Sequence, residues 1–194
     1  MVSQKEERSI MNKVIAQACI TQLLHEIEGP ILRHDLTNTP ERAVKALEEM
    51  LDGYQVDVDS LFRTFDGEGQ DQIVIAKDIP FYSFCEHHLL LFSGKGHIAY
   101  LPREKVLGAS KLPRILTAYA HRLQLQERIT RQVADAIMNH LQPYGVAVIL
   151  EAKHACIVCR GVKSDCSFVT SVMLGTFREN ETTRLEVLSL LGLR

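Results

Sequence analysis

The 194-residue sequence lacks the features that mark membrane, secreted and nucleic-acid-binding proteins. No apolar run approaches the roughly 20 residues that a membrane-spanning helix needs. Residues 1–8 are mostly polar or charged and contain no apolar segment typical of a secretory signal. The formal net charge is only −2, and acidic and basic residues are mixed along the chain, which argues against a basic nucleic-acid-binding surface. We therefore expect a cytoplasmic protein that binds neither a membrane nor nucleic acid.

Cysteine is sparse, and the number of cysteines is odd. An odd, sparse set in a chain expected to be cytoplasmic argues against a framework of disulfides. We expect reduced thiols, some of which bind a metal ion. The five cysteines are Cys19, Cys85, Cys156, Cys159 and Cys166.

The first third of the chain is predicted to be helical. Apolar residues at helical spacing predict a helix from about residue 4 to residue 27, which Gly29 and Pro30 end. A second helix is predicted to begin at Thr39, which can cap it, with Pro40 at its first position.

The remainder has a different character, with β-branched strands on either side of a helical region. The expected fold is α+β: N-terminal helices followed by an antiparallel sheet with helices on one face. No long linker is visible, so we expect a single domain over residues 1–194, with a helical region (1–70) and a core (71–194). Strands are predicted at 72–76, 96–100, 146–158 and 168–177, and helix over 110–141 with a break near 122–125.

The sequence Cys85-Glu86-His87-His88 offers two metal donors at a favourable spacing. Cys85 and His88 are three residues apart, so both side chains point the same way in a helical turn. A thiolate and an imidazole suit zinc. A partly buried cysteine beside two surface histidines is the equally acceptable interpretation of this tetrapeptide alone.

A second candidate segment runs from Lys153 to Arg160. As a strand, it would place His154, Cys156 and Arg160 on one face. Cys156 then completes a three-donor set with a free fourth position, the pattern of a catalytic zinc site. The alternative is a closed structural site that adds Cys159, which strand alternation turns to the opposite face.

Two further segments carry charge. Ser110 can cap a helix that has Lys111 and Arg114 near its N-terminus, where cations are unfavourable unless an anion joins them. A triphosphate would satisfy both, although a solvated basic turn is the commoner situation. Glu127 can pair with Arg131 as a surface ion pair, or it can accept hydrogen bonds from guanine; the spacing alone does not choose.

These segments, in this order, resemble the GTP cyclohydrolase I family. Several separate motifs at matching spacing make a chance likeness improbable, and the resemblance runs from about residue 35 to residue 178. The motifs that carry it lie at residues 81–90, 96–100, 110–114, 122–127, 154–162 and 170–177.

The resemblance implies a zinc enzyme. In its terms, zinc activates the water that attacks GTP, and His154 protonates the imidazole ring of the purine. His87 and Ser110 would assist the later steps on the ribose. The expected products are formate and 7,8-dihydroneopterin triphosphate, in the first step of tetrahydrofolate or tetrahydrobiopterin biosynthesis. The implied zinc ligands are Cys85, His88 and Cys156.

The resemblance also implies how GTP is held and how subunits assemble. Glu127, with Gln126 nearby, would hold the guanine. The family fold, the T-fold, joins sheets from several subunits into a barrel, with sites between subunits of a homodecamer. The residues implied to hold the triphosphate are Lys111, Arg114 and Arg160.

Two other functions use the same residues. Related T-fold enzymes act on other pterins or on deazapurines, some through a nucleophilic cysteine without zinc. A non-catalytic zinc-binding module would use Cys159 as a fourth ligand. Metal analysis discriminates the first alternative, and the effect of Cys159→Ser on zinc binding discriminates the second.

Overall fold

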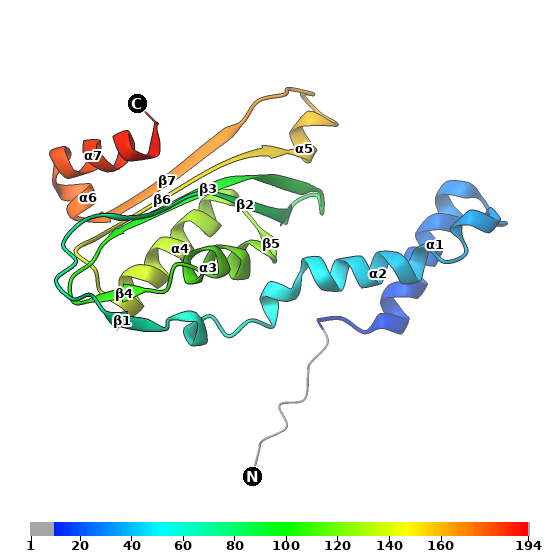
Figure 1. Cartoon of the computed structure of the whole chain (residues 1–194). Helices are drawn as coiled ribbons and strands as arrows, with labels where there is room; N and C mark the ends of the chain where they lie inside the picture. Colours follow the sequence, from blue (N-terminus) through cyan, green and yellow to red (C-terminus); the bar gives the residue numbers. More distant parts are fainter. Residues whose placement is uncertain (1–9, 194) are drawn as a thin grey trace, which may run out of the picture. The chain divides into compact units, whose positions relative to one another are not determined.

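A computed structural model describes residues 10–193, which divide into two compact units on either side of the Gln55–Val56 bond (Figure 1). That the two units together form a single domain stays a prediction. No helix among residues 10–193 is both long and apolar enough to cross a membrane.

The N-terminal unit is helical, as predicted. Helix α1 spans Lys13–Glu28, and the side chain of Asn12 caps it by accepting a hydrogen bond from the Ile15 amide at 3.2 Å. The helix was expected to begin near residue 4; residues 4–9 lie outside the described part, and the Asn12 cap sets the observed start. The short 3-10 helix η1 follows at His34–Leu36.

Helix α2 spans Thr39–Met50, so the prediction that Thr39 caps it was wrong. Thr39 is itself the first helical residue, and Asn38 occupies the cap position without a side-chain hydrogen bond. Pro40 lies in the first turn, where its missing N–H costs no helical hydrogen bond. A 3-10 turn, η2, follows at Asp52–Tyr54.

The C-terminal unit is built on a five-stranded sheet of order β5-β2-β3-β6-β7. All neighbours are antiparallel except β2 and β5, which pair in parallel. Two short strands, β1 and β4, pair separately. The bounds are η3 Asp59–Leu61, β1 Thr64–Asp66, β2 Val74–Cys85, β3 Leu91–Leu101, β4 Lys105–Leu107, β5 Leu123–Gln124, β6 Gly145–His154 and β7 Phe168–Gly175.

Helices cover both faces of this sheet, whereas only one face was predicted to be covered (Figure 1). Helices α3 (Lys111–Ala120) and α4 (Gln126–Leu141) pack on the larger core, and β5 separates them within the predicted break. Helices α6 (Thr176–Glu179) and α7 (Glu181–Leu191) lie on the other face, where buried side chains of α7 meet those of β3 and β6.

The predicted strand over residues 146–158 ends early. Strand β6 stops at His154, and Ala155–Val158 forms a helical turn, α5. The last sheet pairs of β6 are Phe92 with His154 and Phe168 with Ala152, so no neighbouring strand remains beyond that point. The chain therefore satisfies its backbone locally, as in the hydrogen bond from the Cys159 N–H to the Ala155 carbonyl at 2.9 Å.

We expect Gly94→Ala to destabilise the sheet. A Cβ at Gly94 of β3 would overlap the Glu151 carbonyl oxygen and lie 2.7 Å from the Ala152 Cα, and neither backbone atom can turn aside. Such overpacking costs about 1–3 kcal/mol of unfolding free energy. Denaturant unfolding measures it, with the exposed neighbour substitution Ser93→Ala as the control. Equal stability of the two variants would contradict the close approach of β3 and β6.

Candidate metal centre and catalytic site

The structure brings Cys85, His88 and Cys156 together from two distant segments. Cys85 is the last residue of β2, His88 lies in the turn that follows, and Cys156 lies in α5. Their donor atoms all lie within 4.8 Å of one another, and Cys85 Sγ is 3.7 Å from His88 Nδ1. One ion can therefore reach all three.

A tight turn at the end of β2 folds His88 back over Cys85. The Cys85 carbonyl accepts hydrogen bonds from the amides of His88 at 3.3 Å and Leu89 at 2.9 Å. The Cys85 amide donates to the Leu90 carbonyl at 2.8 Å, which closes the turn. The backbone of Leu89 takes a left-handed conformation (φ 54°), which residues other than glycine rarely adopt outside turns. Cys85 and His88 were predicted to come together in a helical turn. They come together instead in a turn at the end of a strand.

The strand-alternation argument for excluding Cys159 was wrong, because Cys156 lies in a helical turn and not in a strand. The grouping of donors found among residues 10–193 nevertheless contains Cys156 and not Cys159. Cys159 is exposed, whereas Cys85 and Cys156 are almost fully covered. The geometry therefore favours three protein donors.

The chemistry of this donor set fits zinc. Two sulfurs and one imidazole nitrogen are borderline-soft ligands, and three protein donors are typical of catalytic zinc sites. Burial and the neighbouring Cys85 raise the pKa of the Cys156 thiol, while the charge of Arg160 opposes this. Burial and their mutual repulsion therefore disfavour the state in which both Cys85 and Cys156 are thiolates. A divalent cation between the two sulfurs would favour that state.

His154, the last residue of β6, lies among aromatic side chains. Its ring stacks on Phe92 with centroids 4.5 Å apart and meets Phe168 edge-on at 5.4 Å. Burial lowers the pKa of His154, and the nearby Glu127 carboxylate partly opposes that effect. His154 Nδ1 is buried and has no hydrogen-bond partner among residues 10–193. The two aromatic contacts hold the imidazole ring in place.

Gln126 and Glu127 open helix α4 and face different surroundings. Gln126 is buried, and its Nε2 donates to the carbonyls of Leu150 at 2.9 Å and Phe168 at 3.0 Å. Gln126 thus ties the start of α4 to β6 and β7. Glu127 is exposed, and its charge reaches His154.

One of the two interpretations of Glu127 from the sequence was a surface ion pair with Arg131. Arg131 instead pairs with Asp135, one turn further along α4, with Nε 2.7 Å from Oδ2.

The basic segment of α3 lies away from the metal donors within one chain. Tyr100, next to the last residue of β3, pairs with Val74 at the start of β2, and its hydroxyl accepts a hydrogen bond from the Leu107 amide at 3.0 Å. Helix α3 begins soon after Leu107, the last residue of β4, at one end of the five-stranded sheet, whereas α5 and β5 lie at its other end (Figure 1). Helix α3 ends shortly before β5, whose Gln124 pairs with Cys85. Its ten residues span about 15 Å, so its N-terminus lies about one helix length away from the turn that carries Cys85 and His88.

Four more predicted site residues are exposed. His87 lies beside His88, with ring centroids 6.2 Å apart, and the charge of Arg160 reaches Cys156. Ser110 occupies the cap position of α3 but makes no capping hydrogen bond, contrary to expectation. Arg114 lies in the first turn of that helix, together with the partly covered Lys111.

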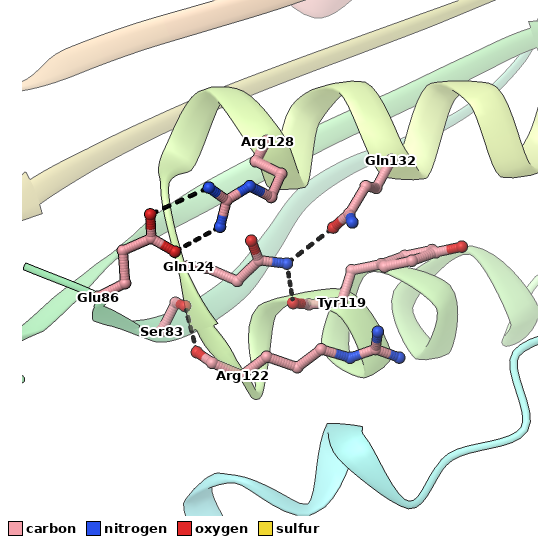
Figure 2. Close-up of polar contacts among 7 residues, drawn as sticks. All are labelled: Ser83, Glu86, Tyr119, Arg122, Gln124, Arg128 and Gln132. Atoms are coloured by element: carbon pink, nitrogen blue, oxygen red, sulfur yellow. Dashed lines mark hydrogen bonds and ion pairs between the residues drawn. The ribbon is translucent and has the colours of Figure 1, made fainter.

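The sequence interpretation missed one ion pair at the site. Glu86, between the two predicted donors of the first motif, pairs with Arg128 of α4 (Figure 2). The residues are 42 positions apart, so no local spacing rule connects them. The only signal was an acidic residue placed inside the metal-binding motif.

An α+β fold with three converging zinc-type donors beside a partly buried histidine has the features of a metal-dependent enzyme. Residues 16–192 match the sequence profile of the family described as GTP cyclohydrolase I. The chain belongs to the GTP cyclohydrolase I family.

Relatives with that name come from both bacteria and fungi. A "GTP cyclohydrolase 1" of Synechococcus sp. (strain JA-3-3Ab) is 49% identical over 90% of this chain and 77% of its own length. A protein of the same name from Methylococcus capsulatus is 45% identical over 92% of this chain and 97% of its own length. One from Saccharomyces cerevisiae is 44% identical over 99% of this chain and 79% of its own length.

Cys156→Ser should abolish tight zinc binding, because it removes one of the three donors grouped among residues 10–193. We expect a loss of affinity greater than about 100-fold, the upper range for residues that merely support a ligand. Chelator competition on the zinc-loaded protein measures it. Cys159→Ser is the matched control and should bind zinc as the unaltered chain does; loss of zinc from the control would establish a four-ligand structural site instead.

Proposed function

We propose that this chain catalyses the zinc-dependent hydrolysis and rearrangement of GTP to 7,8-dihydroneopterin triphosphate, with release of formate. This reaction is the first step of tetrahydrofolate or tetrahydrobiopterin biosynthesis. The observation that carries the proposal is the convergence of Cys85, His88 and Cys156 beside His154 in a member of this family.

Cys85, His88 and Cys156 hold the zinc ion in this proposal. When bound, zinc supplies a Lewis acid that makes a water molecule nucleophilic near neutral pH. The three chain donors leave one coordination position for a ligand that is not protein. The covered position of both cysteines keeps bulk water away from the thiolates.

His154 is the general acid. It donates a proton to the imidazole ring of the purine, which makes C8 electrophilic and prepares it for attack by water. Stacking on Phe92 fixes the plane of the ring, and burial lowers the pKa of His154, which makes its protonated form a stronger acid. The Glu127 carboxylate opposes this lowering of the His154 pKa.

Glu127 and Gln126 hold the guanine base. The exposed carboxylate of Glu127 is an acceptor for the ring N–H and the exocyclic amine of guanine. Gln126 is buried and fixes the first turn of α4 through its bonds to β6 and β7, so it supports the position of Glu127 beside the base.

The triphosphate and ribose contacts require more than one subunit. Lys111 and Arg114 bind phosphate oxygens together with Arg160, and Ser110 acts with His87 on the ribose. Because the N-terminus of α3 lies away from the metal donors of its own chain, a neighbouring copy supplies it.

We assign the assembly to a homodecamer whose sheets join into a barrel, the T-fold arrangement. The edge strand β7 supports this, since Phe168 is 42% and Val169 63% exposed in the single chain. An exposed apolar edge strand is normally covered by another strand or element.

His154→Ala should retain zinc but release formate from GTP much more slowly, by about 10²–10⁴-fold, the usual contribution of a positioned acid. Formate release and pterin fluorescence follow the reaction, and metal analysis confirms that the variant is loaded. The zinc-loaded unaltered chain is the control. Formate release at the normal rate in the variant would remove the acid role from His154, and no formate or pterin from the control would refute the proposed function.

A further inference from the structure

We propose that Glu86 and Arg128 are positioning residues that fix the metal-binding turn against the first turn of α4. The pair would keep the donors Cys85 and His88 at a set position relative to Glu127, the residue assigned to the base. This inference deepens the proposed function and rests on it only for the identity of the substrate.

The pair joins two functional segments at adjacent residues. Glu86 directly follows Cys85 in the turn, and Arg128 directly follows Glu127 in α4. Both Nη atoms of the guanidinium contact the carboxylate: Nη2 lies 3.0 Å from Oε1, and Nη1 contacts Oε2 (Figure 2). This two-pronged geometry fixes relative orientation as well as distance, which a single contact does not.

Stability is not the main effect of this pair. The side chains of Glu86 and Arg128 are 29% and 43% exposed, and ion pairs with this much solvent contact contribute little to the free energy of unfolding. Arg131 and Asp135 form a comparable pair on the same helix, away from the metal-binding turn. The Glu86–Arg128 pair differs in what it connects, not in its expected strength.

Two further hydrogen bonds hold the turn and the end of β2 against the segment that contains β5. The Glu86 amide donates to the Gln124 carbonyl at 3.1 Å, and Ser83 Oγ donates to the Arg122 carbonyl at 3.2 Å. Strand β5, which accepts the first of these contacts, has only two residues, so it needs anchors of its own.

The side chain of Gln124 supplies those anchors. It is buried, and its Nε2 donates to the Tyr119 carbonyl at 3.0 Å and to Gln132 Oε1 at 2.7 Å (Figure 2). The metal-binding turn therefore rests on β5, which is anchored to both α3 and α4, and the Glu86–Arg128 pair adds a direct link to α4.

His88 is the donor that depends most on this link. Its side chain is exposed, so surrounding packing does not fix the ring, and the conformation of the turn must do so. Outer residues that orient metal ligands typically contribute 10–100-fold to metal affinity. Neither Glu86 nor Arg128 belongs to the group of donors, so both act through Cys85 and His88.

The test is a double-substitution cycle on the full zinc-loaded chain. Glu86→Ala, Arg128→Ala and the double variant are compared by chelator competition for zinc and by the absorption spectrum of the cobalt(II)-substituted protein. Each single substitution should weaken metal affinity by about 10–100-fold, with a shifted cobalt spectrum. The double variant should lose no more than either single one, because both remove the same link. Glu86→Gln, which keeps one acceptor, should fall between Glu86→Ala and the unaltered chain.

Arg131→Ala is the matched control, since it breaks the other exposed pair of α4 and should leave zinc affinity and the spectrum unchanged. Thermal unfolding verifies that each variant is folded. Zinc affinity within about twofold of the unaltered chain in both single variants would overturn the proposal, as would additive losses. A raised KM for GTP in Arg128→Ala with zinc affinity intact would also overturn it, by making Arg128 a substrate ligand. If the unaltered chain binds zinc but forms no pterin, the proposed function fails while the metal measurements still decide the positioning role.

Discussion

The site depends on bringing two covered thiols and an imidazole within reach of one ion. Cys85 ends β2 and Cys156 lies just beyond the end of β6, and these strands are not neighbours because β3 lies between them. Adjacent strands lie about 4.8 Å apart, so β2 and β6 are separated by about 10 Å. Straight strands would leave the donors too far apart, and the turn after β2 and the helical turn α5 close the gap to within 4.8 Å. The departure from regular strand geometry is what groups the three donors.

The sequence predicted the grouping of Cys85, His88 and Cys156 that the structure shows, from the residue types in two segments together with the family resemblance. It was insufficient for the backbone around Cys156. The β-branched residues Ile157 and Val158 favour a strand, and they led to the prediction of one. The strand ends at His154 because its neighbours end there, which is a property of the whole sheet and not of the segment. Cys159 was predicted not to be a ligand, and the grouping of donors agrees with this. The reason is the helical turn α5, which leaves Cys159 exposed, and not the strand alternation that the sequence predicted.

Residues that act over long distances in the chain were the least predictable. The burial of Gln126 follows from carbonyls contributed by β6 and β7, and the Glu86–Arg128 pair forms between a turn and a helix far apart in the sequence. Neither depends on local pattern. Helix α7 on the second face of the sheet was missed for the same reason, since its buried residues pack against β3 and β6 rather than continuing a visible motif. Helices α3 and α4, whose boundaries are marked locally, were predicted well.

X-ray absorption spectroscopy at the zinc edge, on the full zinc-loaded chain, tests the central claim most directly. Coordination by Cys85, His88 and Cys156 predicts two sulfur scatterers, one imidazole nitrogen and one further light atom from solvent. The typical zinc–sulfur distance is about 2.3 Å. A shell with three sulfurs and one nitrogen would mean that Cys159 closes the site, and it would contradict a catalytic role for the metal.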